Sequence, residues 1–420
     1  MTFIPLEDRA ERPDLKAKLE AQGVSPILAD LLARRGIEST DELDNALIHL
    51  HPPSALTGAP EAAASLGEAI QRGASMLIVG DYDADGATAT AVMVRGLRKF
   101  GAQVDFLVPD RFAFGYGLTP ALVEHARQRF SPRPDWLITV DNGVSSHAGV
   151  AAAQALGFEV LVTDHHLPGP SLPGTRILNP QLPDCQFPSK HLAGVGVAFY
   201  LIMAVRAWLT QQGHFRGDAP RIDDLLPLVA LGTVADLVSL DANNRRLVAQ
   251  GLQRIRKGLL PPGLAALFQT AGRPSDHASA ADLGFSIGPR LNAAGRLADM
   301  SVGIRCLITD NLQEAFELAQ ALDALNRDRR SLEADNRDQA LANWPPCPRS
   351  SIARGWCSLM QAGTKAWWDS SQADSRTRPT GPPLCLRPTR TDRASRAPGA
   401  PSPGFTCAMC WSGWTASSLA

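Results

Sequence analysis

Four short segments of the sequence carry aspartates and histidines that could bind a divalent metal ion. They are the segments GDYDADG at 80–86, TVDNG at 139–143, TDHH at 163–166 and GTVAD at 232–236. Carboxylate oxygens, with imidazole as an additional ligand, suit Mn²⁺ and Mg²⁺ in proteins. Each segment ends a run of apolar or β-branched residues, so each is expected at the end of a secondary-structure element. The sequence therefore predicts a site for one or two Mn²⁺ or Mg²⁺ ions.

The first segment places three carboxylates, Asp81, Asp83 and Asp85, within five residues. They repel one another unless a cation neutralises them, which favours metal binding over a solvated acidic turn. If the segment is extended, alternation places all three on one side of the chain. Which two contact the metal directly then stays open, and the third is expected to act as an outer ligand or a substrate contact.

The second and third segments supply one more aspartate and a pair of histidines. Asp141 follows an apolar run at 136–140, which favours a metal ligand over an Asx-turn residue in Asp-Asn-Gly. In the third segment we interpret His165 as a metal ligand and His166 as a phosphate contact or acid. Asp164 is expected to be either a ligand or the acceptor that orients a histidine ring.

Two further segments are candidates for contacts with phosphate groups or nucleic-acid bases. One is the glycine-containing stretch 288–296, interpreted as a loop, and the other follows the predicted strand 104–108. Their candidate residues are Arg290, Asn292, Arg296, Arg111 and Tyr116. Guanidinium groups bind phosphate in bidentate fashion and aromatic rings stack on bases. The alternatives are arginines paired with acidic neighbours on a surface loop and a tyrosine packed on its own loop.

Strands and helices alternate in the sequence pattern from residue 75 onward, which predicts an α/β fold. The predicted strands are 76–79, 104–108, 136–140 and 159–162, and the predicted helices between them are 87–100, 120–130 and 145–156. Such alternation indicates a parallel sheet with helices on both faces. Ligands lie beyond the carboxyl ends of the strands in these sheets. Asp81, Asp141 and Asp164 each follow a predicted strand.

The chain divides into five predicted regions. They are a helical N-terminal region at 1–72, the metal-binding core at 73–240, a helical and loop part of the catalytic domain at 241–312, a connector helix at 313–343 and a tail at 344–420. Leucines spaced three and four residues apart define the connector helix, and its other positions are polar. A helix of that kind typically joins two domains.

The tail differs in composition from the rest of the chain. Residues 345–420 hold five of the seven cysteines and nine Lys/Arg against three Asp, and they show no helical or strand period. We interpret the tail as a non-native, disordered stretch of the kind that an out-of-frame reading produces. The Cys407/Cys410 pair is a weaker candidate for metal binding, because no second pair lies at zinc-ribbon spacing.

The remaining 344 residues carry 32 Lys/Arg against 39 Asp/Glu, a net charge of −7. This balance excludes a basic field over the whole protein, so any nucleic acid must bind in a local groove. Their two cysteines argue against a disulfide scaffold. The first residues show no secretory signal, and the longest apolar run, at 192–205, is too short to span a bilayer. We expect a cytoplasmic protein with no membrane contact.

The motifs resemble the DHH phosphoesterase superfamily and, within it, the bacterial RecJ single-stranded-DNA exonucleases. The resemblance rests on GDYDADGAT at 80–88, VDNGVSSHAG at 140–149, DHH at 164–166, LAGVGVAFY at 192–200, GTVAD at 232–236 and GPRLNAAGR at 288–296. It implies hydrolysis of single-stranded DNA from the 5′ end to mononucleotides, dependent on Mn²⁺ or Mg²⁺, in DNA repair and recombination. It also makes Asp236 a metal ligand and a single-strand-binding protein a candidate partner.

RecJ-like proteins continue past the long helix into a second domain with a glycine-rich, His-containing motif and into an OB-fold. Neither pattern follows Leu341 in this sequence, so we expect the activity of this chain to be impaired. Two alternatives stay open. One is a DHH phosphodiesterase that acts on short oligonucleotides or cyclic dinucleotides, and the other is an inactive fragment that binds metal or DNA.

Overall fold

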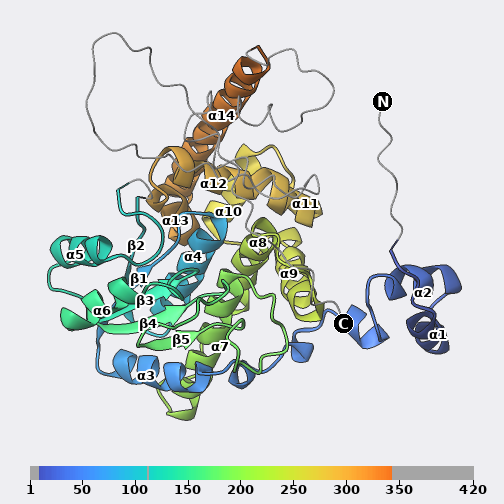
Figure 1. Ribbon diagram of the computed structural model, residues 1–420, viewed down its shortest axis with the longest axis horizontal. Coiled ribbons are helices and arrows are strands. Elements are labelled where there is room, and N and C mark those ends of the chain that lie inside the picture. Colours follow the sequence, from blue (N-terminus) through green and yellow to red (C-terminus); the bar gives the residue numbers. More distant parts are fainter. Residues whose placement is uncertain (1–8, 111–112, 343–420) are drawn as a thin grey trace, which may run out of the picture.

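A five-stranded, all-parallel sheet is the centre of the protein (Figure 1). The structure is a computed structural model and describes residues 9–110 and 113–342. The strands are β1 (Ser75–Val79), β2 (Gln103–Leu107), β3 (Trp136–Val140), β4 (Glu159–Thr163) and β5 (Arg176–Leu178), in the order β2-β1-β3-β4-β5. The predicted strands are confirmed to within one or two residues at each end. The three-residue β5 was missed because it is too short to show a period.

Helices precede, connect and follow these strands. They are α1 (Pro13–Ala21), α2 (Pro26–Ala33), α3 (Ala59–Gln71), α4 (Ala84–Lys99), α5 (Pro120–Arg129), α6 (His147–Ala155), α7 (Gly194–Gln211), α8 (Leu226–Ala235), α9 (Ala242–Arg256), α10 (Pro262–Thr270), α11 (Ala280–Asp282), α12 (Gly288–Leu297), α13 (Ser301–Ile308) and α14 (Leu312–Ala342).

Alternate residues of the strands face two separate cores. Met76 and Ile78 of β1 pack into the larger core with α3, α4, α7 and α8, whereas Leu77 and Val79 pack into a smaller core with α5 and α6. Both faces of the sheet are therefore covered by helices, which confirms the predicted α/β class.

The sheet order creates a switch point between β1 and β3. The chain leaves β1 toward β2 on one side and returns to β3 on the other, so connections diverge from the β1–β3 gap. Ligands of open α/β sheets bind beyond the strands' carboxyl ends at such a point. Asp81 follows β1 and Asp141 follows β3, so both lie at this position.

The stretch 288–296 forms helix α12, so the prediction of a loop there was wrong. Its glycines serve close packing instead of loop flexibility. A Cβ on Gly295 would lie 1.7 Å from the carbonyl oxygen of Tyr82, so only glycine lets α12 approach the first aspartate segment this closely. A π-helical turn, Leu283–Ile287, leads directly into α12.

The predicted connector helix is α14, a single helix of 31 residues that projects away from the sheet (Figure 1). Ala315, Ala319 and Leu322 on its first turns are buried in the main core. Its predicted role in joining two domains stays a prediction. The tail 344–420, with Cys407 and Cys410, lies outside the described residues.

Within the described part of the chain, one helix has the length and apolar composition that a membrane span needs. This helix is α7, and 67% of its 18-residue window is buried inside the protein. Its residues Val197, Phe199 and Leu201 belong to the main core. The burial of α7 is typical of a core helix.

One buried arginine of α9 holds the N-terminal segment, the stretch 34–58 between α2 and α3. The guanidinium of Arg246 donates hydrogen bonds to three carbonyl oxygens of this segment, those of Asp44 at 3.0 Å, His49 at 2.9 Å and Asp41 at 3.1 Å. Arg246 is 7% exposed. Helices α1 and α2, which precede this segment, have a small core of their own.

We expect Arg246→Ala to lower the free energy of unfolding by about 3 kcal/mol, because a buried guanidinium and its three hydrogen bonds to carbonyl groups are lost. The matched control is Arg245→Ala. Arg245 pairs with Glu42 at 3.2 Å but is more exposed, so its loss is expected to cost about 1 kcal/mol or less. Urea titration of both variants measures the difference. Equal losses would contradict the expectation that the contacts of buried Arg246 contribute more to stability than those of the more exposed Arg245.

Candidate metal centre

The first aspartate segment continues from β1 directly into α4. Asp83 is the N-cap of α4 and accepts a hydrogen bond from the Gly86 amide at 2.9 Å. Asp85 already lies in the first helical turn. The segment is therefore not extended throughout, so the condition for placing all three carboxylates on one side is not met. N-cap preference explains the early helix start, because an aspartate side chain satisfies a free amide there.

The Asp85 carboxylate points into the protein and is 1% exposed. It accepts hydrogen bonds from the backbone amides of Gly194, at 2.6 Å, and Val195, at 2.9 Å, in the first turn of α7. The positive end of the α7 dipole adds to these contacts. Helix α7 thus holds the buried Asp85 carboxylate through backbone amides. Among the described hydrogen bonds, no Lys or Arg side chain contacts this carboxylate.

Asp141 sits at the end of β3 in a strained backbone conformation. Its φ of 62° lies in the left-handed region that residues with a Cβ rarely adopt. The next residue, Asn142, donates from Nδ2 to the carbonyl oxygens of Val79 (3.2 Å) and Val140 (2.9 Å), which ties the ends of β1 and β3 together. Strain of this kind, maintained by buried hydrogen bonds, is typical of functional sites.

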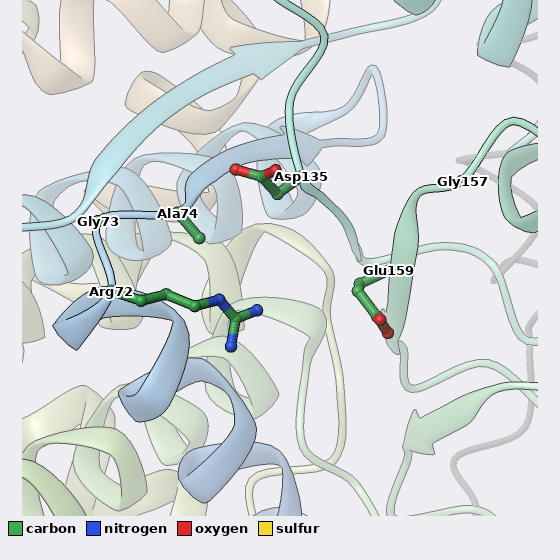
Figure 2. A pocket seen from close by; sticks show the side chains of 6 residues that line it. All are labelled: Arg72, Gly73, Ala74, Asp135, Gly157 and Glu159. Carbon is green, nitrogen blue, oxygen red and sulfur yellow. The ribbon is translucent and has the colours of Figure 1, made fainter.

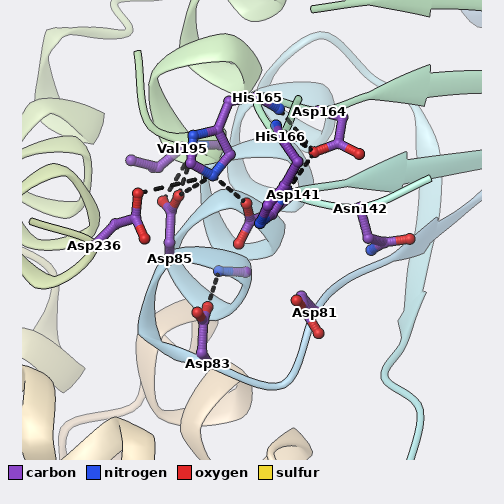
Figure 3. Close-up of polar contacts among 12 residues, drawn as sticks. Asp81, Asp83, Asp85, Asp141, Asn142, Asp164, His165, His166, Val195 and Asp236 are labelled. Atoms are coloured by element: carbon purple, nitrogen blue, oxygen red, sulfur yellow. Dashed lines mark hydrogen bonds and ion pairs between the residues drawn. The ribbon is translucent and has the colours of Figure 1, made fainter. Parts of the chain in front are cut away.

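The histidine pair follows β4, and its two rings face different partners. Asp164 accepts from the Val144 amide at 2.8 Å, and Nδ1 of His166 lies 2.7 Å from its Oδ1. The His165 ring instead points to the carboxylates (Figure 3). Its Nε2 is 3.0 Å from Asp141, 3.7 Å from Asp236 and 3.8 Å from Asp85.

Two groups of potential ligand atoms result from this arrangement, and His165 belongs to both. One group is Asp141, His165 and His166, and the other is Asp85, His165 and Asp236, with ligand atoms within 4.8 Å of one another. The structure brings these five predicted residues together from four elements. Asp81 and Asp83 lie beside the groups but belong to neither, so their role as ligands stays a prediction.

The charges of the site are not balanced by the protein. Burial raises the pKa of Asp85 well above its ordinary value, and the negative charge of Asp236 is the second-largest cause. Burial also raises the pKa of Asp141 well above its ordinary value, with the negative charge of Asp85 as the second-largest cause. The pKa of Asp81 rises to about 8 through burial and the charge of Asp83. Like-charged groups that raise one another's pKa in this way are typical of sites that take a cation.

The residues fit a divalent metal ion by a second criterion. Oδ1 of Asp141 is buried and has no hydrogen-bond partner among the described residues, although Nε2 of His165 lies 3.0 Å away outside hydrogen-bond alignment. Burial lowers the pKa of His165 to about 4, so its imidazole is neutral at pH 7 and has a lone pair for a metal. Burial opposes protonation of His166 too, but the hydrogen bond to Asp164 raises its pKa to about 9.

Of the predicted DNA-contacting residues, Tyr116 lies nearest the site. Its hydroxyl is 3.4 Å from Nε2 of His166, and its ring is about half exposed. Arg111 lies outside the described residues. The phosphate contact of Arg296, which is partly buried and has an interaction within the protein, stays a prediction.

Arg290 and Asn292 point to partners inside the protein. Arg290 is 9% exposed, and its guanidinium pairs with Asp323 of α14 at 2.8 Å and with the Ser286 carbonyl oxygen. Oδ1 of Asn292 accepts a hydrogen bond from the Ala84 amide at 2.7 Å. These contacts fix α12 against α14 and the aspartate segment. The predicted DNA contacts of Arg290 and Asn292 stay predictions.

Sequence reasoning missed three groups that build the site. They are the side-chain amide of Asn142 and the backbone amides of Gly194 and Val195. Asn142 and Gly194 lie in motifs noted above, but the residue type alone does not reveal a backbone donor. The glycine at position 194 is the sequence signal that could have revealed this close approach. A Cβ on Gly194 would lie 2.5 Å from Oδ1 of Asp141.

A separate pocket of about 410 Å³ lies at the amino ends of strands β1, β3 and β4 (Figure 2). Arg72, Asp135 and Glu159 line it, with Gly73, Ala74 and Gly157. Asp135 precedes β3, whereas Asp141 follows it, so the length of the strand separates this pocket from the carboxylate cluster. Its mixed charges show no grouping that resembles the metal centre.

In metal-free protein we expect the melting temperature to fall by several degrees between pH 6.5 and 9. Asp81, with a folded pKa of about 8 against an ordinary 3.8, loses its contribution as pH rises toward 8. His166, with about 9 against 6.5, loses its contribution over the same window. The low pKa of His165 acts in the opposite direction only below pH 6.5. Thermal scans in EDTA measure this slope.

The matched variant for this test is Asp81→Asn, which removes one titrating group without changing its size. It is expected to flatten the pH slope in EDTA. A melting temperature that stays constant or rises between pH 6.5 and 9 would contradict the electrostatic account.

Comparison with known proteins places this site in a family. Residues 75–233 match the DHH family, N-terminal domain, and this range spans the sheet and the aspartate and histidine segments. The single-stranded-DNA-specific exonuclease RecJ of Escherichia coli (strain K12) is 51% identical over 336 residues, which cover 79% of this chain and 57% of that protein. The fold and the site thus define a DHH-type domain.

Similar solved structures narrow the class of protein from DHH-type domains in general to the RecJ exonucleases. A crystal structure of exonuclease RecJ bound to manganese is 38% identical and superposes with a TM-score of 0.60, covering 68% of this chain and 70% of that one. RecJ from Thermus thermophilus in complex with Mn²⁺ is 35% identical, with a TM-score of 0.66 over 80% of this chain and 47% of that one. The chain belongs to the RecJ family. It spans a little over half the length of the curated relatives.

Proposed function

We propose that this chain is a metal-dependent exonuclease that degrades single-stranded DNA in the 5′-to-3′ direction to mononucleotides, in DNA repair and recombination. The observation that carries the proposal is the cluster of buried Asp85 and Asp141 with partly buried His165 and Asp236 at the switch point of the sheet. Relatives named as single-stranded-DNA-specific exonucleases and RecJ structures that contain Mn²⁺ or Mg²⁺ support it.

The proposed ligands are Asp85, Asp141, His165 and Asp236, with Asp81 and Asp83 as outer ligands. When bound, a divalent cation supplies Lewis acidity toward a phosphate and the attacking water. Asp85 and Asp141 provide the negative charge that holds the cation, and neutral His165 completes both groups.

His166 is proposed to contact the scissile phosphate or to protonate the leaving oxygen. Its pKa of about 9 keeps the ring protonated at pH 7, and Asp164 orients it through Nδ1. Tyr116 lies next to this ring and is proposed to contact the DNA, as is Arg111. A cytoplasmic location and a single-strand-binding protein as partner are further proposals that follow from the family.

The test uses a 5′-phosphorylated single-stranded oligonucleotide with the label at its 3′ end, and Mn²⁺ or EDTA. We expect progressive shortening with Mn²⁺, none with EDTA, and immediate release of labelled mononucleotide when the label is moved to the 5′ end. Hydrolysis of dinucleotides or cyclic dinucleotides alone would favour the other DHH phosphodiesterase activity. An intact oligonucleotide, with Mn²⁺ still raising the melting temperature, would indicate a binding fragment without nuclease activity.

A further inference from the structure

Two loops that support the metal centre meet at the first turn of α9. The first loop precedes α7 and includes His191 and Leu192. The loop ends at the backbone amides of Gly194 and Val195, which hold Asp85. The second loop connects α8 to α9 and begins with Asp236. Neither loop belongs to the sheet, so neither is placed by strand pairing.

The side chain of Asn244 joins these two loops. Its Nδ2 atom donates to the His191 carbonyl oxygen at 2.6 Å and to the Ser239 carbonyl oxygen at 2.9 Å. Asn244 is completely buried. The two donated hydrogen bonds use both protons of the amide, so one planar group sets the separation of the two loops.

A second contact braces the same junction. Asp241 is the N-cap of α9. Its Oδ1 accepts a hydrogen bond from the backbone amide of Asn244 at 2.9 Å, and its Oδ2 accepts one from the Ser189 hydroxyl at 2.7 Å. The first turn of α9 therefore fixes the loop before α7 from two directions. Asn244 is the group that also reaches the loop of Asp236.

We propose that Asn244 is a positioning residue of the metal centre, which holds Asp85 and Asp236 at their metal-binding separation without touching the ion. One path runs from Asn244 through His191 along the loop to the Gly194 and Val195 amides, which bind Asp85. The other runs from Asn244 through Ser239 back to Asp236, three residues earlier. Outer residues of this kind tune metal affinity by orienting the ligands. The inference rests on the proposed metal-dependent function.

The neighbouring Asn243 offers a matched control. It lies on the same helical turn, is 1% exposed and has the same size as Asn244. Its Oδ1 accepts from the Tyr200 hydroxyl at 2.8 Å and from the His51 amide at 3.3 Å. These partners lie in α7 and in the N-terminal segment, away from the two loops, so Asn243→Ala removes buried hydrogen bonds without freeing His191 or Ser239.

The experiment compares the whole chain with its Asn244→Ala and Asn243→Ala variants. Calorimetric titration with Mn²⁺ well below the melting temperature gives the Kd, the electron paramagnetic resonance spectrum of bound Mn²⁺ reports its coordination, and thermal scans in EDTA give stability. We expect both variants to lose similar stability. Only Asn244→Ala is expected to raise the Kd for Mn²⁺, by about 10- to 100-fold, and to change the spectrum.

An equal Mn²⁺ affinity in the Asn244 variant and the wild type would overturn the inference, as would an equal loss of affinity in both variants. If Asn244→Ala does not fold, Asn244→Ser, which keeps a donor for one loop, is expected to weaken Mn²⁺ binding to an intermediate degree, and unchanged binding in that variant would equally overturn it. Failure of the wild type itself to bind Mn²⁺ would instead overturn the proposed function, and the inference with it.

Discussion

Asp141→Asn is expected to abolish the Mn²⁺-dependent digestion of single-stranded DNA, with a loss of at least about 100-fold. The amide retains the size of the carboxylate but loses its charge, and the affected oxygen is the buried Oδ1 that lies 3.0 Å from His165. The measurement is the rate of release of mononucleotides from a labelled oligonucleotide in saturating Mn²⁺.

The same substitution is expected to leave the metal-free protein at least as stable as the wild type. Removing the charge of Asp141 relieves its repulsion with Asp85, the largest electrostatic cause of its raised pKa after burial. Lost activity together with retained stability is typical of a group kept for function. Thermal scans in EDTA check this second result.

Asp135→Asn is the control for Asp141→Asn. Asp135 lies at the other end of the same strand, where it accepts from the Ser75 amide at 2.8 Å on an exposed edge. This variant is expected to retain wild-type nuclease activity. Equal losses in the two variants would mean that the position of the carboxylate at the carboxyl end of β3 has no special importance.

Gly194→Ala is expected to disrupt the metal centre by displacing Asp141, against which Gly194 packs. An added Cβ would lie 2.5 Å from Oδ1 and 2.6 Å from Cβ of Asp141, closer than real Cβ contacts occur. Asp141 cannot retreat easily, because its backbone is already strained and it is enclosed at the end of β3. We expect Mn²⁺ affinity to fall by at least about 10-fold and the melting temperature to drop by several degrees.

Gly196→Ala, two residues further along α7, is the comparison. An added Cβ there would meet only the side chain of Leu192, whose flexible Cδ2 end lies nearest at 3.0 Å. This variant is expected to bind Mn²⁺ like the wild type and to melt within a few degrees of it. If Gly194→Ala binds Mn²⁺ as tightly as Gly196→Ala, the close approach of α7 to Asp141 is not required for the site.

The sequence predicted the parts of the fold that periodicity encodes. The strand that ends at Val140 was placed to the residue because five apolar or β-branched residues precede Asp141. The convergence of Asp141 and His165 followed from one rule, that ligands gather beyond the carboxyl ends of parallel strands. Asp236, by contrast, was identified only through the family resemblance, since an aspartate after an apolar helix is more often a cap.

The errors arose where tertiary packing overrides local signals. The two glycines of 288–296 read as a loop, but they lie in α12 because Gly295 packs against the backbone of Tyr82. Arg290, predicted to contact phosphate, pairs with Asp323, which is 33 residues away on α14, and its phosphate contact stays a prediction. No local pattern shows such a pairing. The backbone amides that hold Asp85 were invisible for the same reason, because they come from α7.

The central claim is that the carboxylate and imidazole cluster at the β1–β3 switch point binds the catalytic metal. The most direct measurement is an anomalous difference map from crystals of the protein grown with Mn²⁺. We predict a peak among Asp85, Asp141, His165 and Asp236, the residues that face one another in Figure 3. A fully occupied peak elsewhere, with none in this cluster, would contradict the account.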